Sequence, residues 1–129
     1  GLILKSSMVL AGSEREQQSS PQEVAEATIR TFKNSVPEDV AGIVFLSGGQ
    51  TPERATLNLD AIAEYVAGKT DIPWEFAFSY SRAIEEPVLK AWQGKQENIP
   101  SAQEALLKRL KLNSLADAGE YDPSMEQNA

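Results

Sequence analysis

Three apolar runs, each followed by a stretch with helical or turn character, limit the folds open to this chain more than any other feature. The runs predict strands at residues 1–4, 40–46 and 73–78, and the periodic stretches predict helices at residues 21–36, 52–66, 83–92 and 101–116. Strands that alternate with helices form a parallel sheet with right-handed crossovers. The sequence therefore predicts an α/β fold over residues 1–118, followed by a flexible polar tail at residues 119–129.

Two further expectations concern burial and completeness. The first strand reads as buried because its residues are apolar, and the last helix offers apolar residues for a core-facing side at Ala105, Leu106, Leu110 and Leu115. Three strands are too few to close a barrel, so the sheet is either a small open domain or the last three units of an eight-fold barrel. A chain that starts directly in an apolar strand favours the second interpretation.

Composition excludes several kinds of chemistry within the chain. It has 129 residues, enough for one domain with a core, and contains no cysteine or histidine. Disulfides, thiolate or imidazole metal sites and a Ser-His-Asp triad are therefore excluded, and we predict no metal and no cofactor. The net charge of -7 argues against a nucleic-acid partner. Because no apolar run approaches the ~20 residues that span a bilayer, and no signal peptide is evident, we expect a cytoplasmic protein without a membrane partner.

A glycine-rich turn follows the second predicted strand. Ser47, Gly48 and Gly49 stand between that strand and a helix that begins near Pro52. Glycines let backbone N–H groups approach an anion closely, and the helix dipole adds to the attraction. The pattern indicates a phosphate-binding loop, and the alternative is a glycine turn that binds no ligand.

Arg82 follows the third predicted strand at the same edge of the sheet. Its guanidinium is a permanent cation whose fork of donors matches phosphate oxygens. Parallel barrels commonly hold phosphate with the loops after their last two strands. We therefore expect Arg82 to form a second wall of the anion site, although an arginine at a helix start often forms only a surface ion pair.

Lys5 stands at the end of the first predicted strand, between the apolar residues Leu4 and Met8. Barrel active sites collect at this rim, and a partly desolvated lysine can attack a carbonyl group as a free amine. The alternative is a lysine that points into water. A lysine and two anion-binding segments at one rim are together what a phosphorylated carbonyl substrate requires.

At these residues the chain resembles the class I fructose-bisphosphate aldolases. The resemblance extends from Lys5 to about Tyr121, and Leu-Ser-Gly-Gly-Gln at this distance from Phe-Ser-Tyr-x-Arg is its most specific part. The matching stretches are residues 2–5, 8–9, 42–50, 78–80, 82–83, 89–92, 94–95, 97–98 and 113–116.

The resemblance implies a role for each matching residue. Lys5 would form the Schiff base with the ketone carbon of the sugar phosphate. The loop of Ser47, Gly48 and Gly49 would bind its C1 phosphate. Ser79 and Arg82, at the last strand, would complete that phosphate site.

The resemblance also implies the architecture and activity of the whole. The chain would supply the last three βα units and the C-terminal helix of a (β/α)8 TIM barrel. The complete lyase would cleave fructose 1,6-bisphosphate reversibly into dihydroxyacetone phosphate and glyceraldehyde 3-phosphate in glycolysis and gluconeogenesis. It would form a homo-oligomer, which is a tetramer in this family. The acid and base residues would precede Gly1, so this chain alone would be inactive.

The chain departs from the family pattern at three places. Ser6 and Ser7 stand where the family has proline and asparagine, Ser81 stands where it often has glycine, and the tail lacks a terminal tyrosine. The alternative function that the residues leave open is a non-catalytic α/β module that binds phosphorylated metabolites.

Overall fold

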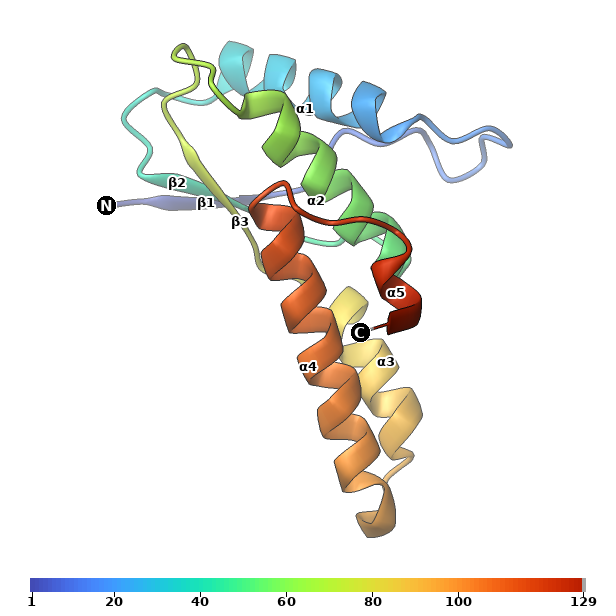
Figure 1. Ribbon diagram of the computed structural model, residues 1–129. Coiled ribbons are helices and arrows are strands. Elements are labelled where there is room, and N and C mark those ends of the chain that lie inside the picture. Colours follow the sequence, from blue (N-terminus) through green and yellow to red (C-terminus); the bar gives the residue numbers. More distant parts are fainter. Residues whose placement is uncertain (129) are drawn as a thin grey trace.

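The computed structural model describes residues 1–128 as a three-stranded parallel sheet with helices packed on one face and a helical hairpin that extends away from it (Figure 1). The predicted α/β fold is confirmed, and residue 129, the end of the expected tail, lies outside the described residues. In chain order the elements are β1 (Ile3–Ser6), α1 (Pro21–Ser35), β2 (Gly42–Phe45), α2 (Pro52–Val66), β3 (Glu75–Phe78), α3 (Arg82–Trp92), the 3-10 helix η1 (Gln96–Asn98), α4 (Ile99–Asp117) and α5 (Met125–Asn128).

The first two helices begin where side-chain caps satisfy their free N–H groups. The backbone N–H of Ser20 donates to Glu23 Oε2 at 2.7 Å, and the N–H of Glu23 donates to Ser20 Oγ at 3.2 Å. This capping box starts α1. At the start of α2, the N–H of Arg54 donates to Thr51 Oγ1 at 3.2 Å. These caps fix the points at which the chain leaves the loops after β1 and β2.

The register of the sheet separates two rows of side chains. β2 lies between β1 and β3, and it pairs Ile43 with Leu4, and Val44 with Lys5 and Ala77. Successive side chains on a strand point to opposite faces. Ile43 is fully buried against the helices, whereas Val44 is only half-buried. Lys5 therefore lies on the face of the sheet that these helices leave uncovered.

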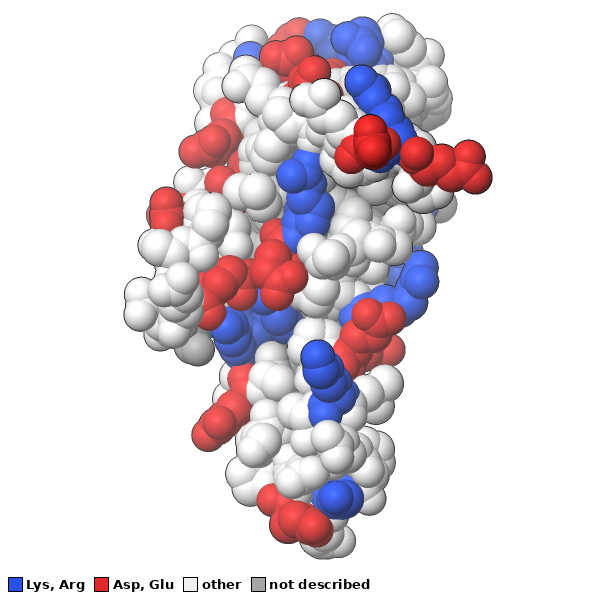
Figure 2. Space-filling view, turned by 90° about the vertical axis from the view of Figure 1, so that its right-hand side faces the viewer, with Lys and Arg blue, Asp and Glu red and all other residues white. Residues whose placement is uncertain are grey.

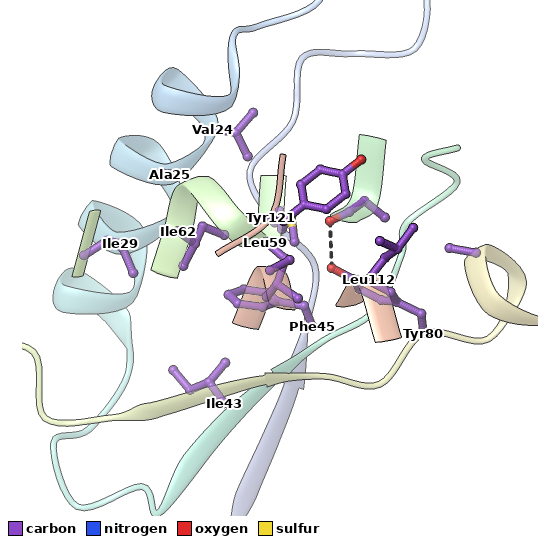
Figure 3. Packing of buried hydrophobic residues seen from close by; sticks show 14 of the residues in the cluster. Val24, Ala25, Ile29, Ile43, Phe45, Leu59, Ile62, Tyr80, Leu112 and Tyr121 are labelled. Carbon is purple, nitrogen blue, oxygen red and sulfur yellow. Dashed lines mark hydrogen bonds between the residues drawn. The ribbon is translucent and has the colours of Figure 1, made fainter. Parts of the chain in front are cut away.

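The core lies between the covered face of the sheet and the helices (Figure 3). The rings of Phe45 and Phe76 stack with centroids 5.8 Å apart, and Phe32 of α1 stacks on Phe45 at 5.9 Å. Stacked aromatic rings bury large apolar areas in defined geometry. This packing fixes α1 and α2 relative to the carboxyl ends of the strands. The two helices contribute Val24, Ala25, Ile29, Leu59 and Ile62 to it.

The first strand differs from its prediction. We expected a buried strand at residues 1–4, but β1 spans Ile3–Ser6, and Ile3 is 63% exposed. β1 is an edge strand, and the helices of residues 1–128 pack on the face opposite to Ile3. The apolar character of this run therefore does not bring burial within the chain. The shift places Lys5 inside the strand and not after its end.

α4 buries a different face from the one that its apolar residues predicted. Leu106 and Leu110 are exposed, and Ala105 and Leu115 are only partly buried. Arg109 and Asn113 are buried in their place, because each forms a hydrogen bond with Thr56 of α2. The buried residues of α4 are Ala102, Arg109, Leu112, Asn113 and Ala116.

Residues 119–128, which we expected to form a flexible tail, make specific contacts with the rest of the chain through two of their residues. Tyr121 is buried, and its backbone N–H donates to Asp60 Oδ1 at 2.9 Å. In α5, Glu126 forms an ion pair with Arg109. The buried ring of Tyr121 and these polar contacts together hold the segment on α2 and α4 (Figure 1). The expected domain boundary at residue 118 and the expected flexibility of the tail stay predictions.

The surface mixes charges of both signs. On the face shown in Figure 2, Lys and Arg side chains are interspersed with Asp and Glu. The longest helix, α4, has 19 residues. Over residues 1–128, none of the helices is both long enough and apolar enough to cross a membrane.

Candidate active site

Lys5 and Ser79 meet at the carboxyl end of the sheet. Lys5 Nζ donates to Ser79 Oγ at 3.3 Å, although 74 positions separate the two residues along the chain. The sheet register explains the contact, because Lys5 aligns with Ala77, and Ser79 lies two residues further on, on the same face. Both side chains are exposed, so the amine is accessible from the uncovered face.

The glycine loop has a backbone that only glycine adopts readily. Gly48 and Gly49 have φ angles of 61° and 80°. Gln50 braces the loop, since its Nε2 donates to the carbonyl of Ser47 at 2.9 Å and its Oε1 accepts from Asn58 at 2.7 Å. The loop is therefore held in shape by α2 itself.

Arg82 reaches the glycine loop from the other strand. Its Nη2 would lie 4.0 Å from a Cβ built on Gly49. A side chain at Gly49 would therefore strain the backbone, and its Cβ would stand in ordinary van der Waals contact with the guanidinium. Arg82 is exposed at the first position of α3, which leaves its donors available to a ligand. The two walls of the predicted anion site are thus adjacent in space.

Four of the predicted site residues form two neighbouring pairs, and the side chain of a fifth, Ser47, is buried. Lys5 meets Ser79, and Gly49 meets Arg82. Ser47 is only 4% exposed, beneath the loop, and its carbonyl accepts from Gln50. A ligand would therefore meet the backbone of the loop before the side chain of Ser47.

Tyr80 connects the two walls, and the sequence analysis missed it. Its hydroxyl donates to the backbone carbonyl of Ala55, in the first turn of α2, at 3.0 Å (Figure 3). The side chain is buried, and burial, with the nearby charge of Asp117, raises the pKa of Tyr80 far above its ordinary value. The hydroxyl therefore stays a neutral donor. A tyrosine between Ser79 and Arg82 was the available signal.

Two departures from the family pattern lie at this rim. Ser6 Oγ donates to the carbonyl of Ser7 at 3.2 Å, which satisfies it locally beside Lys5. Ser81 occupies the N-cap position of α3 without a side-chain capping bond and is exposed. Its hydroxyl is therefore available next to Arg82.

The glycine loop also borders a cleft of about 830 Å³ between the loop and residues 7–19. Arg15 and Arg54 line part of this cleft. Of the predicted site residues, only Gly48 and Gly49 line it. The cleft therefore shares the glycine loop with the predicted site, but Lys5, Ser79 and Arg82 do not line it.

A parallel sheet that presents a lysine and two converging anion-binding segments at its carboxyl ends is typical of barrel enzymes that act on phosphorylated carbonyl compounds. The family described as fructose-bisphosphate aldolase class-I, a glycolytic lyase family, matches residues 1–129. The chain belongs to the class I fructose-bisphosphate aldolase family.

Individual relatives agree with this family. The chain is 46% identical over 126 residues to fructose-bisphosphate aldolase 1, chloroplastic, of Chlamydomonas reinhardtii, a match that covers 98% of the chain and 32% of that protein. It is 48% identical over 121 residues to the cytoplasmic isozyme of Spinacia oleracea, covering 94% of the chain and 33% of that protein. The chain thus spans about a third of the length of these relatives.

A solved structure shows the same fold. It is fructose-bisphosphate aldolase from Plasmodium falciparum in complex with TRAP and a small-molecule inhibitor. The TM-score is 0.85 at 45% sequence identity, and the match covers 93% of this chain and 33% of that chain. The described elements therefore correspond to part of the aldolase barrel fold.

Proposed function

We propose that the complete protein is a class I fructose-bisphosphate aldolase and that Lys5 is its Schiff-base residue. The observation that carries this proposal is the 3.3 Å contact between Lys5 Nζ and Ser79 Oγ on the uncovered face of the sheet. It puts the amine of Lys5 beside the segment that also carries Arg82. The family membership and the names of the relatives support the same reaction.

The substrate we propose is fructose 1,6-bisphosphate. The backbone N–H groups of the loop at Ser47, Gly48 and Gly49 and the guanidinium of Arg82 bind its C1 phosphate, and the exposed hydroxyl of Ser79 adds a hydrogen bond. The phosphate anchors C1, and the adjacent C2 carbonyl then lies within reach of Lys5. Held in this way, the reacting atoms meet without the entropic cost of a bimolecular encounter.

The chemistry follows from the amine. Lys5 Nζ attacks C2, water leaves, and a protonated imine forms. When the C3–C4 bond breaks, its electron pair moves into the imine to give an enamine, and the aldehyde product departs. Protonation of C3 and hydrolysis then release dihydroxyacetone phosphate and the free lysine. We assign the groups that move these protons to parts of the complete protein other than this chain, and the proposed route uses no metal and no cofactor.

We further propose a homotetramer and a cytoplasmic location. The relatives include a cytoplasmic isozyme from spinach, which supports that location, while others are chloroplastic.

The cleavage activity of the complete protein tests the function. Wild-type protein is expected to convert fructose 1,6-bisphosphate into triose phosphates, and Lys5→Met is expected to abolish this conversion. Lys95→Met, at an exposed loop position, is the matched control and should keep full activity. Cleavage that survives in Lys5→Met would refute the role of Lys5.

A further inference from the structure

α4 carries a buried guanidinium that the proposed chemistry does not use. Arg109 is 3% exposed. Its Nη2 donates to Thr56 Oγ1 at 2.6 Å and to the carbonyl of Pro52 at 3.4 Å. Both acceptors belong to the first two turns of α2. Arg109 therefore binds the end of α2 that follows the glycine loop.

The C-terminal segment supplies the counter-charge. Glu126 Oε2 accepts from Arg109 Nη1 at 2.7 Å, and Glu126 Oε1 accepts from the hydroxyl of Tyr121 at 2.9 Å. Lys108 Nζ lies 3.6 Å from the same carboxylate. Burial alone would raise the pKa of Glu126, but the hydrogen bonds and charge of Arg109, with the bond from Tyr121, hold it below its ordinary value. The pair thus stays ionised at neutral pH.

The contacts of Arg109 with α2 lie only a few covalent bonds from the predicted phosphate loop. Pro52 is the first residue of α2, and Thr51, just before it, is the helix cap. Gln50 precedes Thr51 and holds the carbonyl of Ser47. The orientation of this first turn therefore sets the direction of the N–H groups at the loop.

We propose that Tyr121 and Glu126 form a clasp that acts through Arg109 to position the glycine loop, and that this clasp raises the affinity of the site for phosphate. The inference rests on the phosphate-binding role proposed above. Within it, Glu126 and Arg109 are positioning residues that never touch the substrate.

Loss of the clasp would affect the glycine loop, because the buried guanidinium of Arg109 would then lack its counter-charge and one of its hydrogen-bond acceptors. Arg109 Nε has no hydrogen-bond partner among the described residues, so Glu126 is the acid that balances the buried charge. A buried cation that loses its partner moves toward solvent or draws water in. Either response releases Pro52 and Thr56, and the first turn of α2 is then free to shift.

The test compares variants of the complete protein for inhibition by inorganic phosphate and for turnover of fructose 1,6-bisphosphate. Glu126→Gln keeps the shape of the side chain and removes its charge. We expect the inhibition constant of phosphate and the KM to rise about five- to tenfold, with a smaller change in kcat. Glu120→Gln, an exposed acid of the same segment, is the matched control and should behave as wild type.

Two further variants separate the possible failures. If Arg82→Ala leaves the affinity for phosphate unchanged, the proposed phosphate site is wrong, whatever Glu126 does. If Arg82→Ala weakens phosphate binding but folded Glu126→Gln does not, the clasp is wrong. If Glu126→Gln does not fold, Tyr121→Phe decides, because it removes only one hydroxyl contact to the carboxylate. A rise of about twofold in the phosphate inhibition constant supports the clasp, and an unchanged constant overturns it.

Discussion

The hydroxyl of Tyr80 and the carbonyl of Ala55 are joined by a buried hydrogen bond of 3.0 Å. Tyr80 lies between Ser79 and Arg82, and Ala55 lies in the first turn of the helix that follows the glycine loop. One bond therefore ties together the two segments that form the predicted phosphate site. An unpaired buried carbonyl is costly, so the bond specifies the distance between the two segments as well as stabilising them.

Tyr80→Phe tests this connection. The variant loses one hydrogen bond and leaves the carbonyl of Ala55 buried without a partner, so we expect a loss of about 1–2 kcal/mol in the free energy of unfolding. The affinity for phosphate should fall at the same time, because the two walls are no longer tied. Urea unfolding and phosphate inhibition measure both effects. Tyr65→Phe, on the half-buried side of α2, is the control, and an equal response in both variants would contradict the account.

Arg82 should contribute to binding and not to folding. Its side chain is exposed beside Gly49, so replacement by alanine removes a charge-assisted contact worth roughly 1.5–3 kcal/mol to a bound phosphate. Affinity for phosphorylated ligand should fall about 10- to 150-fold in Arg82→Ala. The melting temperature should change little. A large loss of stability with intact binding would show that Arg82 is structural, and Arg30→Ala on the surface of α1 controls for general loss of charge.

The pH dependence of stability should report on Glu126. Its pKa in the folded protein lies below the ordinary value of 4.5, so the folded state favours the carboxylate more than the unfolded chain does. This contribution is present above pH 4.5 and is lost as the pH falls through the lowered pKa. Glu126→Gln should therefore be less stable than wild type by about 2 kcal/mol at pH 7, and the difference should shrink at pH 3.

Urea unfolding of wild type and Glu126→Gln at the two pH values gives this difference. Glu120→Gln again serves as the control. A difference between wild type and Glu126→Gln that is the same at both pH values would mean that the charge of Glu126 does not contribute.

Local signals in the sequence predicted much of the fold. The periodic apolar residues of 21–36 and 52–66 located α1 and α2, because the period of a helix can be seen within a short stretch of sequence. The parallel sheet followed from the alternation of elements. The same alternation predicted that the glycine loop and Arg82 would be neighbours, and they are.

The remainder depended on contacts between distant residues. The buried face of α4 carries Arg109 and Asn113, whose partner Thr56 lies 53 and 57 positions away. Tyr121 is held by Asp60 across 61 positions. Periodicity describes one helix at a time, and it ranks polar residues as exposed unless the partner is known. The polar buried face of α4 and the contacts of the C-terminal segment could therefore not be predicted from the sequence.

The isolated 129-residue chain is expected to behave as an incomplete fold. It exposes large apolar side chains at Leu2 and Ile3, where the edge strand begins, and at Leu89 and Leu107 on the helical hairpin. An apolar edge strand favours association between chains. We expect aggregation or weakly cooperative unfolding when the chain is expressed alone. A soluble monomer with a sharp thermal transition would contradict this and favour an independent phosphate-binding module.

Covalent trapping tests the central claim most directly. The complete protein is incubated with dihydroxyacetone phosphate, reduced with borohydride and digested, and the modified peptide is identified by mass spectrometry. The account predicts that the added mass lies on Lys5, because its amine is exposed beside Ser79 at the rim that binds phosphate. Added mass on another lysine, with Lys5→Met still active, would contradict it.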